Sequence, residues 1–302
     1  MNPRSLWLAA ALVLSPAAHA RVATVLEEPT VKSPTADPSI TDRPPVKAIE
    51  PKKIILVGDS TTQVGSGWGG AFCAYHVVSI VACVDLARGG RSTYSYRAEG
   101  SWDLALREIK SGGYGAVYVL IQFGHNDQPG KPGRSTNLET EFPANLRLYV
   151  EEARAAGAIP VLLTPLTRRE FIDGRLRDSL APWADKVRAV AAEMKVPLID
   201  LLARSQAAVQ GIGPAEAVKL AMIPPPPEVL NAVTETGTTL PVVAPAPESE
   251  LAPVVPPPGP AGSFKPVFDY THVGRGGADY FAAIVADGLA RAVPELAKDI
   301  VP

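Results

Sequence analysis

The stretch KIILVGDSTTQVGSGWGG, residues Lys53–Gly70, decides how the rest of the chain is interpreted. It begins with the apolar run Ile54–Val57, which predicts a buried strand, and that strand ends at the GDS sequence of residues 58–60. A glycine-rich loop follows. Ser60 then has two interpretations: it belongs to a turn that caps the next helix, or it is a nucleophile held at the carboxyl edge of a parallel sheet.

Short apolar runs rich in strand-forming residues alternate with helix-like stretches along most of the chain. Strands are predicted at Ile54–Val57, Val81–Leu86, Ala116–Phe123, Ile159–Leu163 and Val196–Ile199. Helices are predicted at Trp68–Val78, Trp102–Lys110, Asn145–Ala156, Trp183–Met194 and, as an amphipathic closing helix, Gly276–Val293. This alternation indicates an α/β fold with a central parallel sheet that helices cover on both faces.

The composition limits the classes of partner. The chain has 302 residues, of which 46% are hydrophobic and 20% charged, which is enough for one large domain with additional segments. The formal net charge is −2 and no basic stripe occurs, which argues against nucleic acid and anionic membranes as partners. The sequence has no H-E-x-x-H motif and no Cys/His cluster, so we expect no metal and no other cofactor.

Residues 1–20 have the features of a secretory signal peptide. Arg4 supplies the positive charge, Leu6–Leu14 is an apolar run too short to span a bilayer, and AHA at 18–20 is a small-x-small cleavage site. No cysteine follows that site, and no later run reaches ~18 consecutive apolar residues. The mature protein is therefore expected to be soluble and exported, to the periplasm or the extracellular space.

Two proline-rich segments interrupt the globular pattern. Residues 21–51 predict a flexible or extended leader, so the globular domain is expected at residues 52–302. Inside that domain, residues 224–262 predict a disordered or polyproline II insertion, because proline lacks an amide donor and restricts φ. The position of this insertion also allows a second interpretation, as a lid or spacer beside a functional site.

Chemically active residues follow the predicted strands. In doubly wound sheets, ligands bind outside the carboxyl ends of the strands. Those ends carry GDS at 58–60, LARGGRST at 86–93 and FGHND at 123–127, and DYTH at 269–272 precedes the last helix. Together they offer a hydroxyl, glycine amides, a side-chain amide, and an imidazole with a nearby carboxylate. Four such segments at one sheet edge favour the interpretation of Ser60 as a nucleophile.

His272 is the strongest candidate for the general base. A serine hydroxyl attacks poorly until a base takes its proton. Asp269 lies three residues before His272, and this spacing lets its carboxylate bind Nδ1–H while Nε2 faces the nucleophile. His76 falls inside a predicted helix and is interpreted as a structural or surface residue. His125 lies near the predicted site, but no carboxylate stands at an obvious orienting spacing.

Three hydrogen-bond donors are candidates for holding the oxyanion that forms when an ester is attacked. They are the backbone amides of Ser60 and Gly90 and the side-chain NH₂ of Asn126. Each of the last two has a structural alternative. Gly89 and Gly90 would also suit a tight turn after a strand, and Asn126 would also stabilise a turn through its side chain.

With these motifs, the sequence resembles the SGNH (GDSL-type) hydrolase superfamily. GDST carries Ser60, GGRS carries Gly90, GHND carries Asn126, and DYTH carries Asp269 and His272. The resemblance covers about residues 53–200 and 264–292. GDST, ARGGRST and FGHND together resemble the rhamnogalacturonan acetylesterase branch of the superfamily.

The resemblance implies a fold and an activity. It implies a flavodoxin-like three-layer α/β/α sandwich and a serine ester hydrolase that removes O-acetyl groups from pectin through a Ser60–His272–Asp269 triad. The choice of Gly90 over Gly89 for the oxyanion hole follows from matching the glycine directly before Arg91. The proline-rich insertion and the long leader are departures from the family pattern.

Further residues are candidates for contact with an acetylated polysaccharide or oligosaccharide. Arg91 and Arg168 are expected to flank the mouth of the site, where a guanidinium could hold a galacturonate carboxylate; a structural salt bridge is the alternative. His125 is a third candidate. Cys73 and Cys83 are the only cysteines, so they form either a disulfide, which an oxidising compartment favours, or two buried free thiols.

Two other functions are compatible with the sequence. An esterase of this superfamily could act on acetyl-xylan, on a bacterial envelope glycan, or on a lipid or thioester. The more distant alternative is a non-catalytic glycan-binding envelope protein with proline tracts as spacers. The complete set of candidate catalytic side chains argues against that second alternative.

Overall fold

The computed structural model describes residues 37–40, 42, 49–241 and 267–302. The chain divides into two compact units, Met1–Ala48 and Ile49–Pro302. In the first unit, the described residues form a turn in which Asp37 Oδ1 accepts hydrogen bonds from the amide and hydroxyl of Ser39. The second unit contains the sheet and every predicted site residue. The predicted signal peptide and most of the predicted leader lie outside the described residues.

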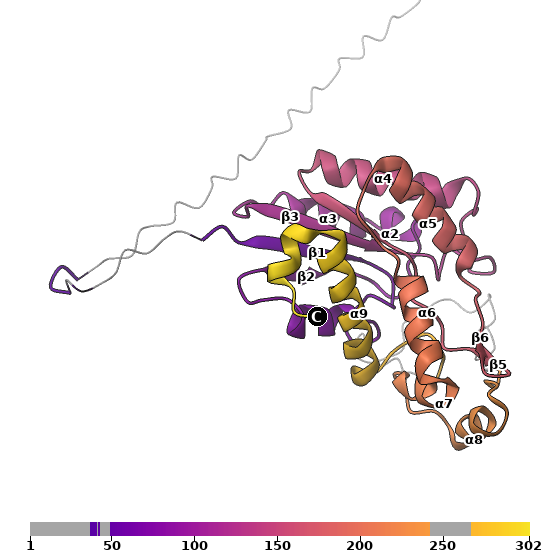
Figure 1. The fold of residues 1–302 in the computed structure, drawn as a ribbon. Helices are drawn as coiled ribbons and strands as arrows, with labels where there is room; N and C mark the ends of the chain where they lie inside the picture. Colours follow the sequence, from indigo (N-terminus) through magenta and orange to yellow (C-terminus); the bar gives the residue numbers. More distant parts are fainter. Residues whose placement is uncertain (1–36, 41, 43–48, 242–266) are drawn as a thin grey trace, which may run out of the picture. The chain divides into compact units, whose positions relative to one another are not determined.

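Five parallel strands form the central sheet, in the order β2-β1-β3-β4-β7 (Figure 1). Their bounds are β1 Lys52–Gly58, β2 Ala82–Asp85, β3 Ala116–Gln122, β4 Ile159–Leu163 and β7 Leu198–Ile199. The chain leaves β1 first to one side, through β2, and then to the other side, through β3. The strand order therefore reverses at β1, and such a switch point is where open α/β sheets bind ligands.

Helices cover both faces of this sheet (Figure 1). One layer contains α1 Gly69–Tyr75, α6 Leu201–Ile212 and α9 Arg275–Ala292, and the other contains α3 Ser101–Ile109, α4 Glu141–Ala155 and α5 Ala181–Met194. The shorter elements are α2 Ser95–Ala98, the β5 Phe171–Ile172 and β6 Arg175–Leu176 hairpin, α7 Pro214–Ala217, η1 Val218–Leu220, α8 Pro227–Thr236 and η2 Pro294–Asp299. None of the helices in the described ranges combines the length and the apolar character that a bilayer span requires.

Consecutive residues of β1 face opposite layers of the core. Ile54 and Leu56 pack in the cluster beneath α1, α6 and α9, whereas Ile55 and Val57 pack in the cluster beneath α3, α4 and α5. A strand buried on both faces is apolar at every position and does not alternate with polar residues. The structure confirms the α/β fold with a parallel sheet between two helical layers.

The prediction that residues 224–262 contain no helix is wrong for α8. Its first residues are Pro226, at the N-cap, and Pro227, and a proline costs little there because the first amides of a helix have no intrahelical partner. No proline follows within the helix, and Gly237 ends it with φ 67°. Residues 242–266 of the predicted insertion lie outside the described residues.

Helix α8 packs against the segment that carries the candidate base. Val229 and Val233 of α8 form a small apolar cluster with Val218 and Tyr270. The hydroxyl of Tyr270 donates a hydrogen bond to the carbonyl oxygen of Leu240 at 2.8 Å. Since Tyr270 follows Asp269 directly, this cluster anchors the start of the DYTH segment.

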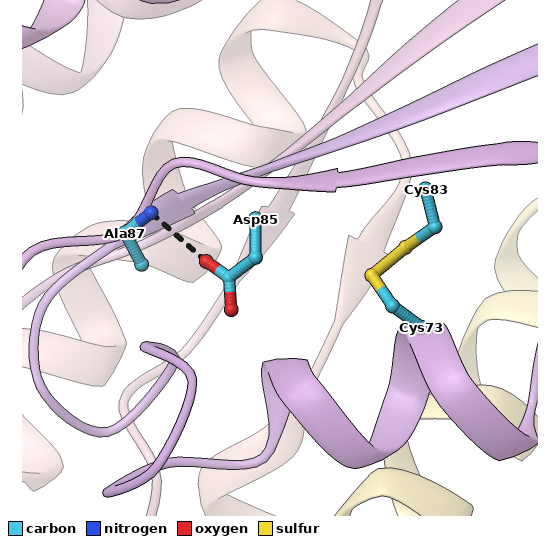
Figure 2. Close-up of a disulfide and its surroundings, with 4 residues drawn as sticks. All are labelled: Cys73, Cys83, Asp85 and Ala87. Carbon is cyan, nitrogen blue, oxygen red and sulfur yellow. Dashed lines mark hydrogen bonds between the residues drawn. A yellow bond between two sulfur atoms is a disulfide. The ribbon is translucent and has the colours of Figure 1, made fainter.

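A disulfide joins Cys73 of α1 to Cys83 of β2 (Figure 2). Of the two alternatives that the sequence left open, a disulfide or two buried free thiols, the structure has the disulfide. The bond spans a sequence separation of 10 and ties a covering helix to the edge strand of the sheet. Closing a loop of this length restricts the unfolded chain and contributes about 2–3 kcal/mol to stability.

Asp85, at the end of β2, is a half-buried residue near the disulfide (Figure 2). Its Oδ1 accepts a hydrogen bond from the amide of Ala87 at 2.9 Å. Burial nevertheless raises the pKa of Asp85 to about 7, because the charged form loses its hydration. The folded protein therefore keeps a proton on Asp85 at pH values where the unfolded chain has already released it.

The raised pKa of Asp85 predicts a pH-dependent loss of stability. The contribution of this group to the free energy of unfolding should be complete below pH ~4 and should decline as the pH rises through ~7, by about 1–3 kcal/mol. Asp85→Asn, which cannot ionise, should lack this decline. Urea denaturation of both proteins between pH 4 and 8 measures the difference. If the free energies of unfolding of the two proteins differ by the same amount at every pH in this range, the prediction is wrong.

Candidate active site

Ser60 stands on a tight turn directly after β1. The carboxylate of Asp59 builds this turn: its Oδ1 accepts hydrogen bonds from the amide of Thr61 at 2.8 Å and from the hydroxyl of Thr61 at 2.7 Å. The carbonyl oxygen of Asp59 also accepts a hydrogen bond from the amide of Gln63 at 3.0 Å. The turn places the Ser60 hydroxyl beyond the carboxyl end of a central strand, at the switch point of the sheet.

The end of β3 supports this turn from the neighbouring strand. Gln122 donates from Nε2 to the hydroxyl of Thr61 at 2.6 Å, and its Oε1 accepts from Trp68 Nε1 at 2.7 Å. Gly58 allows the close approach, because a Cβ at that position would lie 2.7 Å from the carbonyl oxygen of Gln122. The glycine before Asp59 is therefore required by packing between β1 and β3.

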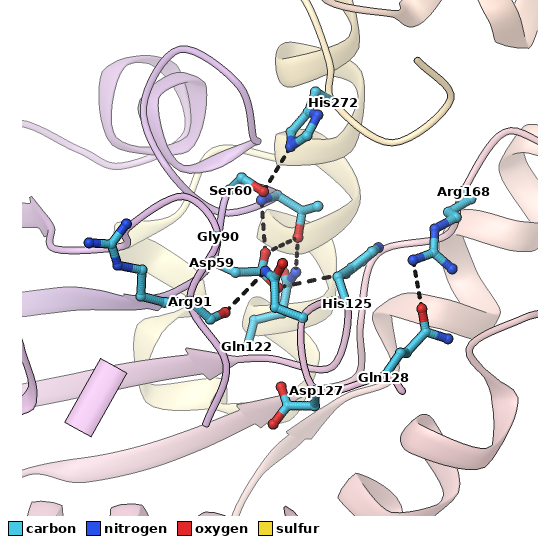
Figure 3. Close-up of polar contacts among 12 residues, drawn as sticks. Asp59, Ser60, Gly90, Arg91, Gln122, His125, Asp127, Gln128, Arg168 and His272 are labelled. Atoms are coloured by element: carbon cyan, nitrogen blue, oxygen red, sulfur yellow. Dashed lines mark hydrogen bonds and ion pairs between the residues drawn. The ribbon is translucent and has the colours of Figure 1, made fainter. Parts of the chain in front are cut away.

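His272 contacts Ser60 (Figure 3), and Asp269 completes a relay behind it. Nε2 of His272 lies 2.8 Å from Ser60 Oγ, and Nδ1 lies 2.7 Å from Asp269 Oδ2. Asp269 Oδ1 accepts hydrogen bonds from the backbone amides of Thr271 and His272, both at 2.7 Å. Burial acts to raise the pKa of Asp269, but its hydrogen bonds and the charge of His272 hold that pKa below its usual value.

We call residues 269–272 the histidine loop and residues 60–67 the serine loop. Ser66 connects the two: its hydroxyl donates to the carbonyl oxygen of Ser60 at 2.7 Å, and its own carbonyl oxygen accepts the amide of Val273 at 2.9 Å. Sequence analysis did not single out Ser66. A serine between two glycines offers no signal for this role before the partner loop is known.

The loop that carries Gly90, a candidate oxyanion donor, passes beside Ser60 (Figure 3). A Cβ on Gly89 would lie 3.6 Å from Ser60 Cβ, so the glycine backbone passes next to the nucleophile. Gly90 has φ 76°, a conformation that side chains rarely adopt. In the described ranges, neither the Ser60 amide nor the Gly90 amide donates a hydrogen bond to another residue. Asn126 donates from Nδ2 to the Arg91 carbonyl oxygen at 3.1 Å, which leaves its second amide hydrogen for a ligand.

Asp127 holds the loops after β2 and β3 together. Its Oδ1 accepts hydrogen bonds from the hydroxyl of Thr93 at 2.5 Å and from the hydroxyl of Thr136 at 3.0 Å. Burial raises the pKa of Asp127 to about 7. The hydroxyl of Tyr149 in α4 also donates to the Thr93 carbonyl oxygen, at 3.0 Å. These contacts fix Gly90 and Asn126, which lie on the two loops, relative to each other.

His125 does not reach the surface, contrary to its assignment as a substrate contact. It is 4% exposed, and its Nδ1 lies 3.7 Å from Asp59 Oδ2. Burial, together with the positive charge of Arg168, lowers the pKa of His125 well below its usual value. Burial likewise raises the pKa of Asp59. His125 is therefore a buried neighbour of Asp59 beneath the serine turn and not a side chain at the surface of the site.

The two arginines predicted at the mouth of the site differ in their partners. Arg91 forms a structural salt bridge, which was the alternative to a substrate contact. Its Nε donates to Glu99 at 2.8 Å, and its guanidinium also donates to the Gly89 carbonyl oxygen at 2.8 Å. Arg168 donates to the neutral side chains of Gln128 (Figure 3) and Ser179, both at 2.7 Å. Among the described residues, no carboxylate forms an ion pair with Arg168.

Two further cations near the site were not predicted. Arg134 lies 3.4 Å from the carbonyl oxygen of Gly90 and 3.4 Å from Asn126 Oδ1. Burial lowers the pKa of Lys131, and the charges of Arg168 and Arg134 lower it further. Their sequence, KPGR at 131–134, reads as an ordinary surface turn. Only the fold shows that this turn lies beside the oxyanion donors. Within the described ranges, no group of three or more acidic, histidine or cysteine side chains could hold a metal ion.

Comparison with known proteins gives the same family as the motifs. The model of the GDSL-like lipase/acylhydrolase family matches residues 56–218. The rhamnogalacturonan acetylesterase RhgT of Bacillus subtilis is 36% identical over 179 residues, which are 57% of this chain and 74% of that protein. A second B. subtilis protein, named probable rhamnogalacturonan acetylesterase YesY, is 33% identical over 161 residues, 51% of this chain and 72% of that protein.

Solved structures show the same fold. The crystal structure of YxiM from Bacillus subtilis has a TM-score of 0.56 at 24% identity, and the match covers 80% of this chain and 57% of that one. A protein from Parabacteroides merdae described as a GDSL-like lipase has a TM-score of 0.50 at 15% identity, with 81% and 98% covered. The family match extends over more than half of the sequence and includes Ser60, Gly90 and Asn126. The chain therefore belongs to the GDSL-like lipase/acylhydrolase family and is a serine ester hydrolase.

Proposed function

We propose that this protein is an exported carbohydrate esterase that removes O-acetyl groups from pectin through a covalent acetyl-enzyme. The observation that carries the proposal is the relay from Ser60 Oγ to His272 Nε2 at 2.8 Å and from His272 Nδ1 to Asp269 Oδ2 at 2.7 Å. A serine acyl-transfer mechanism needs a nucleophile, a base and an orienting carboxylate that are hydrogen-bonded in this order.

In the first half of the reaction, His272 Nε2 takes the proton of Ser60 Oγ as that oxygen attacks the acetyl carbonyl carbon. Asp269 accepts Nδ1–H and stabilises the imidazolium that forms. The lowered pKa of Asp269 keeps this carboxylate ionised at neutral pH. The ester C–O bond then breaks, the sugar oxygen leaves with the proton from Nε2, and the acetyl group remains on Ser60.

In the second half, water replaces the sugar. His272 takes a proton from the water, the resulting hydroxide attacks the acetyl carbon, and Ser60 leaves with the proton from Nε2, which releases acetic acid. In both halves the carbonyl oxygen becomes an oxyanion. The amides of Ser60 and Gly90 and the side chain of Asn126 are the donors that would stabilise it.

Two observations support pectin as the polymer. First, relatives at 36% and 33% identity are named as a rhamnogalacturonan acetylesterase and a probable one. Second, Arg168, Arg134 and Lys131 gather beside the site without a carboxylate partner among the described residues. Pectin carries galacturonate carboxylates that such cations would attract, whereas xylan acetyl groups stand on a largely neutral chain.

The N-terminal sequence supports export. Residues 1–20 have the pattern of a signal peptide, so a chain recovered outside the cytoplasm should begin at Arg21; recovery of the intact chain in the cytoplasm would contradict export.

A substrate panel tests the proposed function. We expect acetate release from acetylated pectin to exceed release from acetyl-xylan, and to decrease when the pectin carboxylates are methyl-esterified. Hydrolysis of p-nitrophenyl esters should decrease from acetate to octanoate, since an acetyl site needs little apolar volume. Ser60→Ala should abolish all of these activities, whereas Ser39→Ala, at an exposed serine, should have no effect. Activity in Ser60→Ala would refute the mechanism, and a preference for octanoate would refute the acetylesterase assignment.

The proposed oxyanion hole predicts the effect of truncating Asn126. Asn126→Ala should lower kcat for p-nitrophenyl acetate about 100- to 1000-fold, because one preorganised donor is lost in the transition state. KM should change little, since the donor matters most when the negative charge has formed. Asn231→Ala removes an exposed amide from α8 and is the matched control. A folded Asn126→Ala protein with kcat within about fivefold of the wild type would exclude Asn126 from the oxyanion hole.

A further inference from the structure

Arg169 is a fully buried arginine whose side chain binds the main chain of the histidine loop. It is 0% exposed. Its guanidinium donates to the carbonyl oxygen of Thr271 at 3.2 Å and to that of His272 at 2.8 Å. The amide of Arg169 also donates to the carbonyl oxygen of Tyr270 at 2.9 Å. One residue thus contacts three consecutive carbonyl groups of the segment that carries the candidate base.

The charge of Arg169 is buried without an ion pair. No carboxylate of a described residue lies within salt-bridge distance of it. Burial lowers the pKa of Arg169 to about 10, and the negative charge of Asp269 opposes that shift, so the guanidinium remains protonated at neutral pH. Burying an unpaired charge costs several kcal/mol, and an apolar side chain would fill the same space without that cost. Packing alone therefore does not account for an arginine here.

The histidine loop lacks the support that a sheet would give it. It belongs to no strand of the central sheet, and its neighbour Val273 makes only an isolated bridge with Ala221. The carbonyl oxygen of His272 accepts one other hydrogen bond, from the amide of Met222 at 3.1 Å. The guanidinium of Arg169 supplies two fixed donors where a neighbouring strand would otherwise supply backbone amides.

We propose that Arg169 is a positioning residue for catalysis. By holding the carbonyl groups of Thr271 and His272, it fixes the main chain from which the imidazole extends, so that Nε2 stays within hydrogen-bonding distance of Ser60 Oγ. The neighbouring Arg168 is directed to Gln128 and Ser179 and does not share this role. The proposal rests on the proposed function, since positioning matters only if His272 acts as the base.

The test compares Arg169→Met with Arg169→Lys. Active sites are counted by titration with diethyl p-nitrophenyl phosphate, and kcat and KM for p-nitrophenyl acetate are measured per titrated site. We expect Arg169→Met to lower kcat at least ~100-fold with KM within about threefold, because misplacing a catalytic group by ~1 Å has effects of this size. Arg169→Lys keeps the charge and one donor, so it should recover at least ~10-fold of the loss. Arg188→Met removes a partly buried arginine from ion pairs with Asp185 and Asp200, and is the matched control.

A second measurement separates positioning from general stability. Arg169→Ala leaves a space of guanidinium size, and millimolar guanidinium should raise its kcat above that in equal NaCl. Circular dichroism at the assay temperature verifies folding. If Arg169→Met is folded and its kcat per site is within about threefold of the wild type, the inference is wrong. If Arg169→Met does not fold, the decision falls to Arg169→Ala. The inference is then wrong if guanidinium does not raise the kcat of Arg169→Ala. Activity in Ser60→Ala would instead refute the proposed function and leave the role of Arg169 without a basis.

Discussion

The proposed chemistry depends on one contact between residues that are 212 positions apart in the sequence: Nε2 of His272 lies 2.8 Å from Oγ of Ser60. A hydroxyl and an imidazole so far apart in the chain meet only if each of their two loops is held in a fixed position relative to the other. The turn built by Asp59 and Gln122 holds the serine, and Ser66 and Arg169 hold the histidine loop. The remaining fold supplies the rigid sheet edge on which these loops stand.

Much of this fold could be predicted because its signals are local. The unbroken apolar run of β1 indicated a buried strand, and the helix predicted at Asn145–Ala156 corresponds to α4, whose buried residues include Leu146, Tyr149, Val150 and Ala153. The predicted strand over residues 159–163 has the observed bounds. The relay was predictable for a related reason: glycine, serine, asparagine and an Asp–His pair each stood directly after a strand or before a helix, and parallel strands bring such positions to one edge.

The rest depends on which segments meet across the fold, and no local pattern reveals that. His125 stands in a motif that follows a strand, yet it points into the protein and lies beside Asp59. Arg168 and Arg169 are adjacent and chemically identical, but one faces polar side chains near the site and the other is buried under a loop a hundred residues further along the chain. α8 was hidden because a high proline content was taken as excluding a helix, whereas its prolines occupy only the first turn.

The hydrogen bond from Tyr270 to Leu240 connects the catalytic segment to a part of the fold that does not touch the reacting atoms. It joins the histidine loop to the residues that follow α8, at two points of the chain that are 30 residues apart. A substitution that shifts the main chain of α8 would therefore also disturb Tyr270, and through it the carboxylate of Asp269 that orients the imidazole.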